Sequence, residues 1–229
     1  MVERMDRRHL VIRLVALLAL AERAAAADLL SQADAAAGIR AALERGALSA
    51  VGLLGRPDGF LANPTVRIPL PGFLEDAAKL LKAVGQQKRV DELVTAMNRA
   101  AEQAVPEAKP VLLQAARGLS VDDAVRIVRG GDTSVTDYFA GKTRAPLTEK
   151  FLPIVTRATQ RVALADKYNA LAGRATRLGF VKPEEANLQH HVTGKALDGL
   201  FFVVGEEERK IRRDPLATGS ALLRKVFGL

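Results

Sequence analysis

The stretch Gly55–Gly72, GRPDGFLANPTVRIPLPG, constrains the fold of this chain more than any other feature. Its four prolines lack a backbone donor and bias the residue before them away from the helical conformation, and three glycines interrupt it further. It is nevertheless too apolar for a solvated linker, since it contains Phe60, Leu61, Val66, Ile68 and Leu70. We therefore expect an extended, proline-rich strap that lies on a helical body and buries alternate side chains.

The rest of the chain favours helices. Apolar residues recur at intervals of three and four, most regularly over residues 88–104, which is the spacing of one helix face. Aromatic residues make up only 4% of the 229 residues and tryptophan is absent, which suits helices packed through small and branched aliphatic side chains. The sequence predicts an all-α fold, a single multi-helix domain of roughly eight to ten helices over residues 28–229.

Several local signals set expectations for individual helices. Ser120, with an acid three residues later, predicts a capping box that opens a short helix to about Arg129. Pro146 predicts an interruption, and Pro153 a kink or a fresh helix start. Residues 192–212 predict the most buried helix, whose charged second half, including Glu206–Glu208, is expected to emerge into water.

The N-terminal residues resemble a secretory signal peptide. Arg4, Arg7 and Arg8 precede a short apolar run, and the small residues Ala24–Ala27 offer a cleavage site. The run is too short to span a bilayer, which needs about 20 apolar residues. We expect residues 1–27 to be removed near Ala27 and the mature chain, without a transmembrane span, to be periplasmic; an ordinary amphipathic helix is the alternative. Because the sequence has no cysteine, it has no lipid-anchoring cysteine and no disulfide.

Charge and residue types exclude several classes of function. The formal net charge is +8, but lysine and arginine are scattered among acids, with no basic block interleaved with aromatics, so no specific nucleic-acid signal exists. His190 and His191 are adjacent and point in different directions, so we predict no metal site. Ser120 and Ser134 are better explained as helix caps than as nucleophiles. No residue pattern predicts a cofactor or names a catalytic residue.

Long, ordered motifs resemble the DUF4197 family of bacterial proteins over nearly the whole mature chain. They include Asp34–Gly38, Pro57–Phe60, Asn63–Pro64, Arg67–Pro71, Asn98–Glu102, Gly130–Asp132, Tyr138–Phe139, Lys142–Thr143, Lys150–Val155, Tyr168–Asn169 and Lys195–Phe201. The resemblance implies an exported protein of Gram-negative bacteria, although some members carry a lipoprotein cysteine that this chain lacks. Because the family is functionally uncharacterised, the resemblance supplies no catalytic residue.

Polar residues on and near the strap suggest a binding site. Asp198 lies in an apolar helical stretch and, if buried, needs a partner, which Arg67 or Arg99 could supply. Such contacts would be structural ties between strap and bundle. Alternatively, a polar mouth for an anionic group is lined by Asn63, Arg67, Asn98 and Arg99.

Two classes of function fit these observations. The first is a non-enzymatic envelope protein that binds an apolar or amphiphilic ligand, or a partner protein, in a groove between helices that the strap covers. The second is a hydrolase-type enzyme that uses aspartate or glutamate, with Asp132, Asp198, Tyr138 and Tyr168 as candidates. A purely structural scaffold is a third.

Overall fold

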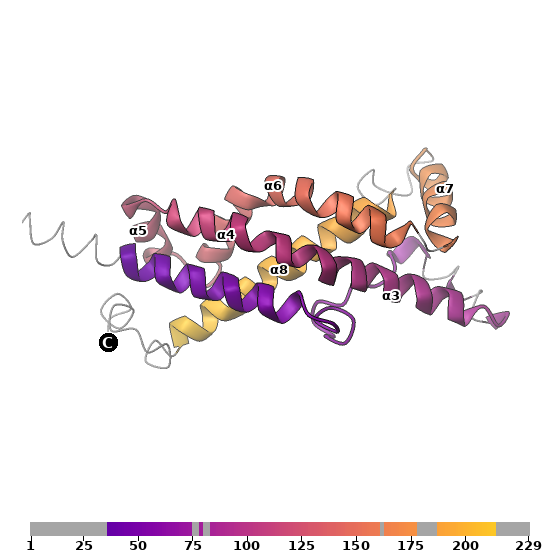
Figure 1. Ribbon diagram of the computed structural model, residues 1–229, viewed down its shortest axis with the longest axis horizontal. Coiled ribbons are helices and arrows are strands. Elements are labelled where there is room, and N and C mark those ends of the chain that lie inside the picture. The colour runs from indigo at the N-terminus through magenta and orange to yellow at the C-terminus, as the bar shows by residue number, and fades with distance from the viewer. Residues whose placement is uncertain (1–35, 75–77, 80–82, 161–162, 178–186, 214–229) are drawn as a thin grey trace, which may run out of the picture.

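The computed structural model describes residues 36–74, 78–79, 83–160, 163–177 and 187–213. These residues form an elongated bundle of helices (Figure 1), and no strand occurs among them. The expected signal peptide, residues 1–27, lies outside the described residues. The prediction of an all-α fold is confirmed.

A helix over residues 36–54 opens the described chain and buries one stripe of small and aliphatic side chains. The stripe is Ala36, Ile39, Leu43, Ala47 and Val51, each at most 8% exposed. These residues recur at intervals of three and four, which places them on one face of the helix. Gly46 faces the C-terminal helix, and a side-chain carbon in its place would lie 3.7 Å from the Cβ of Glu207, which is an ordinary contact distance.

Two consecutive helices lie end to end in one rod and are joined by a short 3-10 helix. Helix α3 (Gln87–Ala104) continues through the short 3-10 helix η2 (Val105–Glu107) into α4 (Ala108–Arg117), and Figure 1 shows these three elements as one rod. Pro106 lies in the first turn of η2, where its missing N–H costs little. The described residues hold the six α-helices α3–α8 together with the helix over residues 36–54, fewer than the eight to ten expected.

Helix α6 (Ser134–Thr159) runs without a break through Pro146 and Pro153, so the predicted interruption and fresh start are wrong. Both prolines are exposed, so the carbonyls that they leave without a backbone partner face the solvent side of the helix. On the opposite side, Phe139, Leu147 and Phe151 are completely buried. Packing of this buried face holds the helix together across both prolines.

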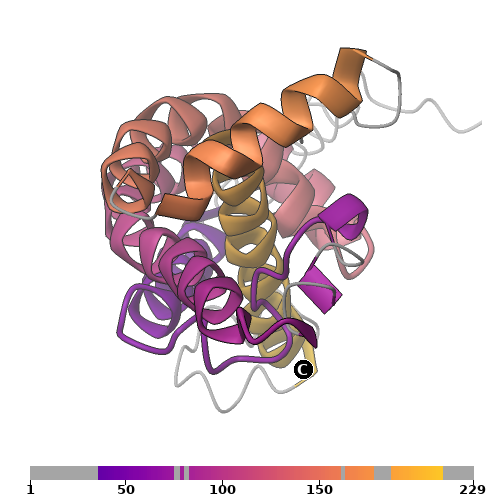
Figure 2. The same ribbon diagram turned by 90° about the vertical axis from the view of Figure 1, so that its right-hand side faces the viewer.

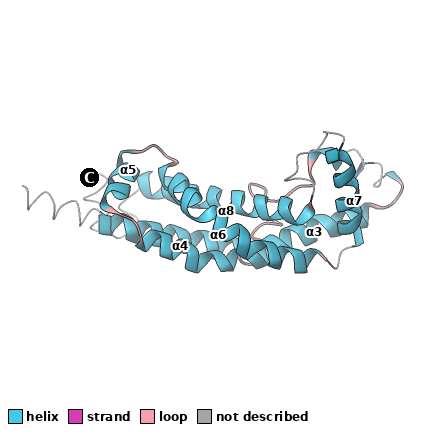
Figure 3. Ribbon diagram, turned by 90° about the horizontal axis from the view of Figure 1, so that it is seen from above, coloured by secondary structure: helices cyan, strands magenta, loops and turns pink. Residues whose placement is uncertain are grey.

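Helix α8 (Leu188–Arg213) lies at the centre of the bundle, as the view along its long axis shows (Figure 2). It packs along α6, which in turn packs against α3. Helix α5 (Val121–Arg129) lies at one end of the bundle and α7 (Ala163–Arg177) at the other (Figure 3). As predicted, α8 is largely buried, but its charged second half does not emerge entirely, because Glu208 is only 5% exposed.

Residues 55–71, here called the irregular segment, contain no helix, but they do not form the predicted extended strap. Residues 57–62 and 64–66 are turns, and only residues 67–71 run without one. Burial alternates only over residues 65–69, where Val66 and Ile68 are buried and their neighbours are exposed; in the turns before them, the adjacent residues Gly59 and Phe60 are both buried. After it come the 3-10 helix η1 (Gly72–Leu74) and a stretch that is only partly described.

No helix of the described residues combines the length and the apolar character needed to cross a membrane. The prediction of no transmembrane span therefore agrees with this part of the chain.

Candidate functional site

Asn98 of α3 fastens the irregular segment to the bundle. Its side chain is fully buried, and its Oδ1 accepts the backbone N–H of Ile68 at 2.8 Å. Its Nδ2 donates to the carbonyl of Ile68 at 3.0 Å and to that of Val94 at 2.8 Å. The amide thus pairs with Ile68 as a neighbouring strand would, and both of its Nδ2 hydrogens are used within the protein.

Glu102, one helical turn further along α3, holds the first half of the same segment. It is 4% exposed, and its Oε1 accepts the backbone N–H groups of Phe60 and Leu61, each at 3.0 Å. Its Oε2 accepts from Arg99 at 2.7 Å, and Arg99 also pairs with Asp58 at 2.8 Å. The hydrogen bond to Glu102 is the main cause that raises the pKa of Arg99 above its ordinary value. We call Asn98, Arg99 and Glu102 the α3 clamp.

Close backbone approaches complete this attachment. Gly199 of α8 faces Phe60 and Val66, and a side-chain carbon at its position would lie 2.8 Å from the Phe60 ring. Gly59 lies against the carbonyl of Leu54, where such a carbon would lie 2.5 Å away. Asp58 has a φ of 67°, in the left-handed region that aspartate tolerates better than most residues. The irregular segment is therefore positioned by α3 and α8 together.

The structure brings the four predicted site residues to this attachment, but they differ in how their side chains are used. Asn98 is buried and Arg99 is held by two carboxylates, as described above. The Oδ1 of Asn63 accepts the N–H of Thr65 within a local turn. Arg67 is exposed, and its guanidinium has no hydrogen bond or ion pair among the described residues. Of the four, only Arg67 presents an uncommitted charge.

Arg67 borders a groove between the irregular segment and α8, which we call the α8 groove, with a volume of about 310 Å³. Thr65, Arg67 and Pro69 form one side, and Lys195, Asp198 and Phe202 form the other. Val66, Ile68 and Gly199 complete its lining. Phe202 is 40% exposed, an unusual exposure for a phenylalanine. The groove therefore combines an apolar lining with two cations and one acid.

Asp198 is not buried, and it pairs with neither Arg67 nor Arg99, the two partners that the sequence suggested. Its side chain is 52% exposed and pairs with Arg144 of α6 at 2.8 Å and with Lys195 at 3.9 Å. The guanidinium of Arg144 also lies 5.2 Å from the centre of the Phe201 ring, within the range of a cation–π contact. Asp198 therefore stays outside the protein interior and balances only part of the surrounding positive charge.

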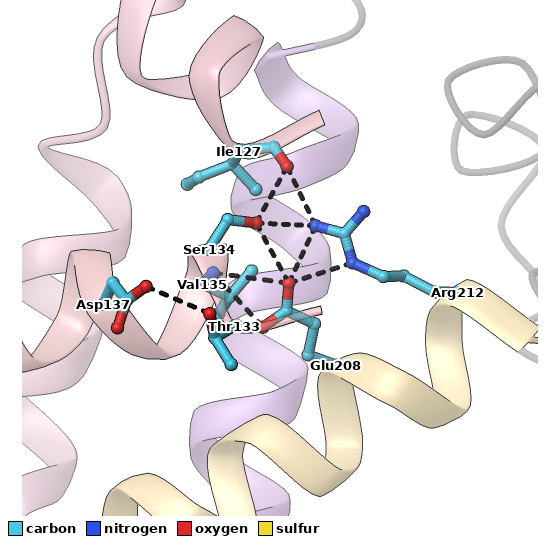
Figure 4. A network of polar contacts seen from close by, with 7 residues as sticks. All are labelled: Ile127, Thr133, Ser134, Val135, Asp137, Glu208 and Arg212. Atoms are coloured by element: carbon cyan, nitrogen blue, oxygen red, sulfur yellow. Dashed lines mark hydrogen bonds and ion pairs between the residues drawn. The ribbon is translucent and has the colours of Figure 1, made fainter. Parts of the chain in front are cut away.

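A second polar network joins α5, α6 and α8 (Figure 4). Buried Glu208 of α8 accepts the backbone N–H of Val135 with both oxygens, at 3.2 and 3.3 Å, and pairs with Arg212 at 2.8 Å. Arg212 donates to the carbonyl of Ile127 at 2.8 Å and to the Ser134 hydroxyl at 2.7 Å. A carboxylate at the positive end of α6 is favourable. We call this network the junction.

The junction accounts for its polar groups internally and leaves little space for a ligand. The Ser134 hydroxyl lies 2.9 Å from the carbonyl of Ile127 and 3.2 Å from Glu208. The neighbouring cavity, bordered by Ile39, Phe139 and Glu208, has a volume of about 30 Å³. That is room for about two water molecules. The junction is therefore a structural tie.

Other sequence candidates are also committed to structural contacts. The predicted capping box is confirmed: the N–H of Asp123 donates to the Ser120 hydroxyl at 3.0 Å, and the N–H of Ser120 donates to Asp123 at 3.4 Å. The hydroxyl of Tyr138 donates to the carbonyl of Ala115 at 2.9 Å. Burial, with a smaller contribution from Asp123, raises the pKa of Tyr138 above its ordinary value, so the phenol remains a donor at neutral pH.

Within the described ranges, no three histidine, cysteine, aspartate or glutamate side chains come together as a metal site. His190 is exposed while His191 is buried, as adjacent residues of a helix can be.

Sequence reasoning missed the two buried glutamates and the cations opposite Arg67. Glu102 had a signal: it lies four residues after Asn98, so both project from the same face of α3, beside the apolar stripe. Glu208 had none, since it lies within a run of three glutamates. Lys195 and Arg144 reach the groove region only through the packing of α8 and α6, which the sequence did not specify.

The sequence was compared with known proteins in three ways. No curated protein and no solved structure matched the chain. Residues 29–228 match a family described as "Protein of unknown function (DUF4197)". Because this match spans nearly the whole chain, the protein belongs to the DUF4197 family.

Proposed function

We propose that the protein is a non-enzymatic component of the bacterial envelope that binds an amphiphilic ligand with an anionic group in the α8 groove. The observation that carries the proposal is Arg67, an exposed guanidinium without a partner among the described residues, at the edge of an apolar groove. Guanidinium groups favour planar anions because two parallel N–H groups bind two oxygens at once.

The charges around the groove support an anion rather than a cation. Arg67 and Lys195 line it, and the single acid in the lining, Asp198, is already paired with Arg144 and Lys195. The surplus of positive charge attracts an anion from a distance and holds it at the groove edge. The remaining acids of the predicted enzyme site do not join Asp198 there, so the lining supports binding rather than hydrolysis.

The lining also supports an apolar portion in the ligand. Phe202, Pro69 and Val66 border the groove, and Phe202 in particular is left 40% exposed. Covering such surface is favourable by about 25 cal/mol per Å² of apolar area removed from water. The volume of about 310 Å³ lies at the lower end of the range of small-molecule sites, about 300–1,000 Å³.

The envelope location is part of the proposal and rests on the sequence of residues 1–27. A basic start, a short apolar run and small residues near Ala27 are the features that direct export. Expression of the full chain, fractionation, and the intact mass of the product will test cleavage near Ala27. A full-length product that stays in the cytoplasm would contradict export.

The ligand is tested by purifying residues 28–229 from the periplasm without detergent, followed by native mass spectrometry and solvent extraction. We expect a reproducible adduct that Arg67→Ala and Lys195→Ala reduce. Arg56→Ala is the matched control, since Arg56 is exposed on the same segment but does not line the α8 groove. Arg99→Ala is unsuitable because it would also break the α3 clamp.

The possible results separate the alternatives. An adduct lost only in the groove variants supports the proposal, provided that thermal unfolding of these variants is unchanged. An adduct retained in both variants places the ligand elsewhere and contradicts the proposed site. A clean apo mass and an empty extract contradict tight ligand binding and turn the search toward a protein partner.

A further inference from the structure

The part of the irregular segment that contains Arg67 also borders a second groove. Besides the α8 groove, a groove of about 570 Å³ lies between residues 64–70 and the first half of α3, and we call it the α3 groove. Arg67 and Pro69 line both grooves. The same short stretch therefore forms a common wall, with α3 on one side and α8 on the other.

The two grooves have the same kind of lining. The α3 groove is bordered by the apolar residues Leu70, Val90 and Val94, with one lysine, Lys79, and one acid, Asp91. The α8 groove likewise combines apolar side chains with one lysine, Lys195, and one acid, Asp198. Apart from Arg67, the described charged residues that line each groove are thus one lysine and one acid.

Arg67 is therefore the surplus cation of both grooves, and it lies on the wall they share. Its guanidinium has no partner among the described residues, while Asp91 and Asp198 each have a lysine in their own groove. One anionic group bound to Arg67 has apolar surface available on two sides. A ligand with one apolar chain would cover only one of them.

We infer that the ligand is an anionic lipid with two apolar chains, its phosphate bound by Arg67 and one chain in each groove. This inference rests on the proposed function and names its ligand class. A phosphodiester carries one negative charge, which matches the single uncommitted guanidinium, and two chains that diverge from one headgroup match two grooves that diverge from one wall.

The test uses soluble, short-chain lipids and titration calorimetry on residues 28–229. The probes are dihexanoyl phosphatidylglycerol, a one-chain lysophosphatidylglycerol, dihexanoyl phosphatidylcholine and inorganic phosphate. We expect the two-chain anionic lipid to bind at least about tenfold more tightly than each of the others. Inorganic phosphate that binds equally well would show that the site recognises free phosphate alone and would overturn the inference.

Each groove is then filled separately. Asp91→Trp fills the α3 groove and Thr65→Trp the α8 groove, both at exposed positions. Asp91→Asn controls for the lost charge, and Thr95→Trp places the same side chain at an exposed position of α3 outside the grooves. We expect either filled groove to weaken the two-chain lipid about tenfold and to change the affinity for the one-chain lipid less than about twofold.

The outcomes distinguish this inference from the proposed function. If Asp91→Trp leaves two-chain binding unchanged while Thr65→Trp and Arg67→Ala abolish it, the ligand uses the α8 groove alone and only the inference fails. If no probe binds the wild-type protein, or Arg67→Ala binds all of them equally well, the inference and the anionic site of the proposed function fail together. Thermal unfolding of every variant verifies that the fold persists.

Discussion

Two buried glutamates do similar work in different parts of the molecule. Glu102 in the α3 clamp and Glu208 in the junction are 4% and 5% exposed, and each pairs with an arginine of its own helix. Glu102 accepts two backbone N–H groups and Glu208 accepts one. They differ in the arginine. Arg99 is 36% exposed and reaches a surface aspartate, whereas Arg212 is 16% exposed and turns inward to Ile127 and Ser134.

This difference in exposure shows that the junction depends more on its glutamate–arginine pair than the α3 clamp does. Water already solvates part of Arg99, so that side chain keeps a favourable environment without Glu102. Arg212 is more buried and pairs with Glu208 inside the junction, where loss of the buried carboxylate is costly. We therefore expect the bundle to tolerate changes at the α3 clamp better than at the junction.

The largest effect is expected for Glu208→Ala. It removes a buried carboxylate that pairs with Arg212 and accepts the Val135 N–H, so we expect a loss of about 3–5 kcal/mol in the free energy of unfolding. Chemical denaturation measures this loss. Glu206→Ala is the control, because Glu206 pairs with Arg209 at the surface of the same helix, and we expect a change below about 1 kcal/mol. Equal effects of the two substitutions would contradict a structural role for the junction.

An intermediate effect is expected for Asn98→Ala in the α3 clamp. Both backbone groups of Ile68 lose their partner, which predicts a loss of about 2–3 kcal/mol. Loosening of the segment should also speed tryptic cleavage after Arg67, whereas Arg56 precedes a proline and resists trypsin. Thr95→Ala, at an exposed position of α3, is the control. Unchanged stability and cleavage would mean that apolar packing of the segment suffices.

The smallest effect is expected for the cap of α5. Its hydrogen bonds join residues three positions apart, whereas the α3 clamp and the junction join segments that are far apart in the sequence. Ser120→Ala should cost about 1 kcal/mol. The hydrogen bond with Ser120, more than the one from Arg126, lowers the pKa of Asp123. Because the folded pKa is the lower one, this stabilisation is present above the unfolded value of about 3.9 and is lost as pH falls through the folded pKa.

Denaturation at several pH values between 2 and 7 measures the contribution of Asp123. Ser120→Ala should reduce the decline in stability on acidification below about pH 4 relative to the wild type. A decline of the same size in both proteins would show that the capping box does not contribute to it.

Local signals in the sequence predicted local structure well. The stripe of the helix over residues 36–54, helix α3 and the capping box of α5 all follow from residues within a few turns of one another. The prolines of α6 led to a wrong prediction of helix ends. The helix continues through them because it packs against residues that are far away in the sequence. The same reason explains why the charged run around Glu208 was expected in water.

The candidate site was only partly predictable. The irregular segment and Arg67 stand out in the sequence because proline and glycine exclude helix and the apolar residues require cover. The sequence could not show that Asn98 and Arg99 serve mainly as ties, because their partners are backbone groups and an aspartate about 30–40 residues away. Nor could it place Lys195 opposite Arg67, which depends on the packing of α8.

The α3 clamp binds the irregular segment almost entirely through its backbone. Asn98 and Glu102 hold peptide groups of residues 60, 61 and 68 and none of the exposed side chains between them. Those exposed positions are thus free to vary without loss of the attachment, as the residues of a recognition loop vary on a fixed scaffold. An engineer could therefore change the exposed residues Ala62, Thr65 and Arg67 to alter what is bound while keeping the bundle.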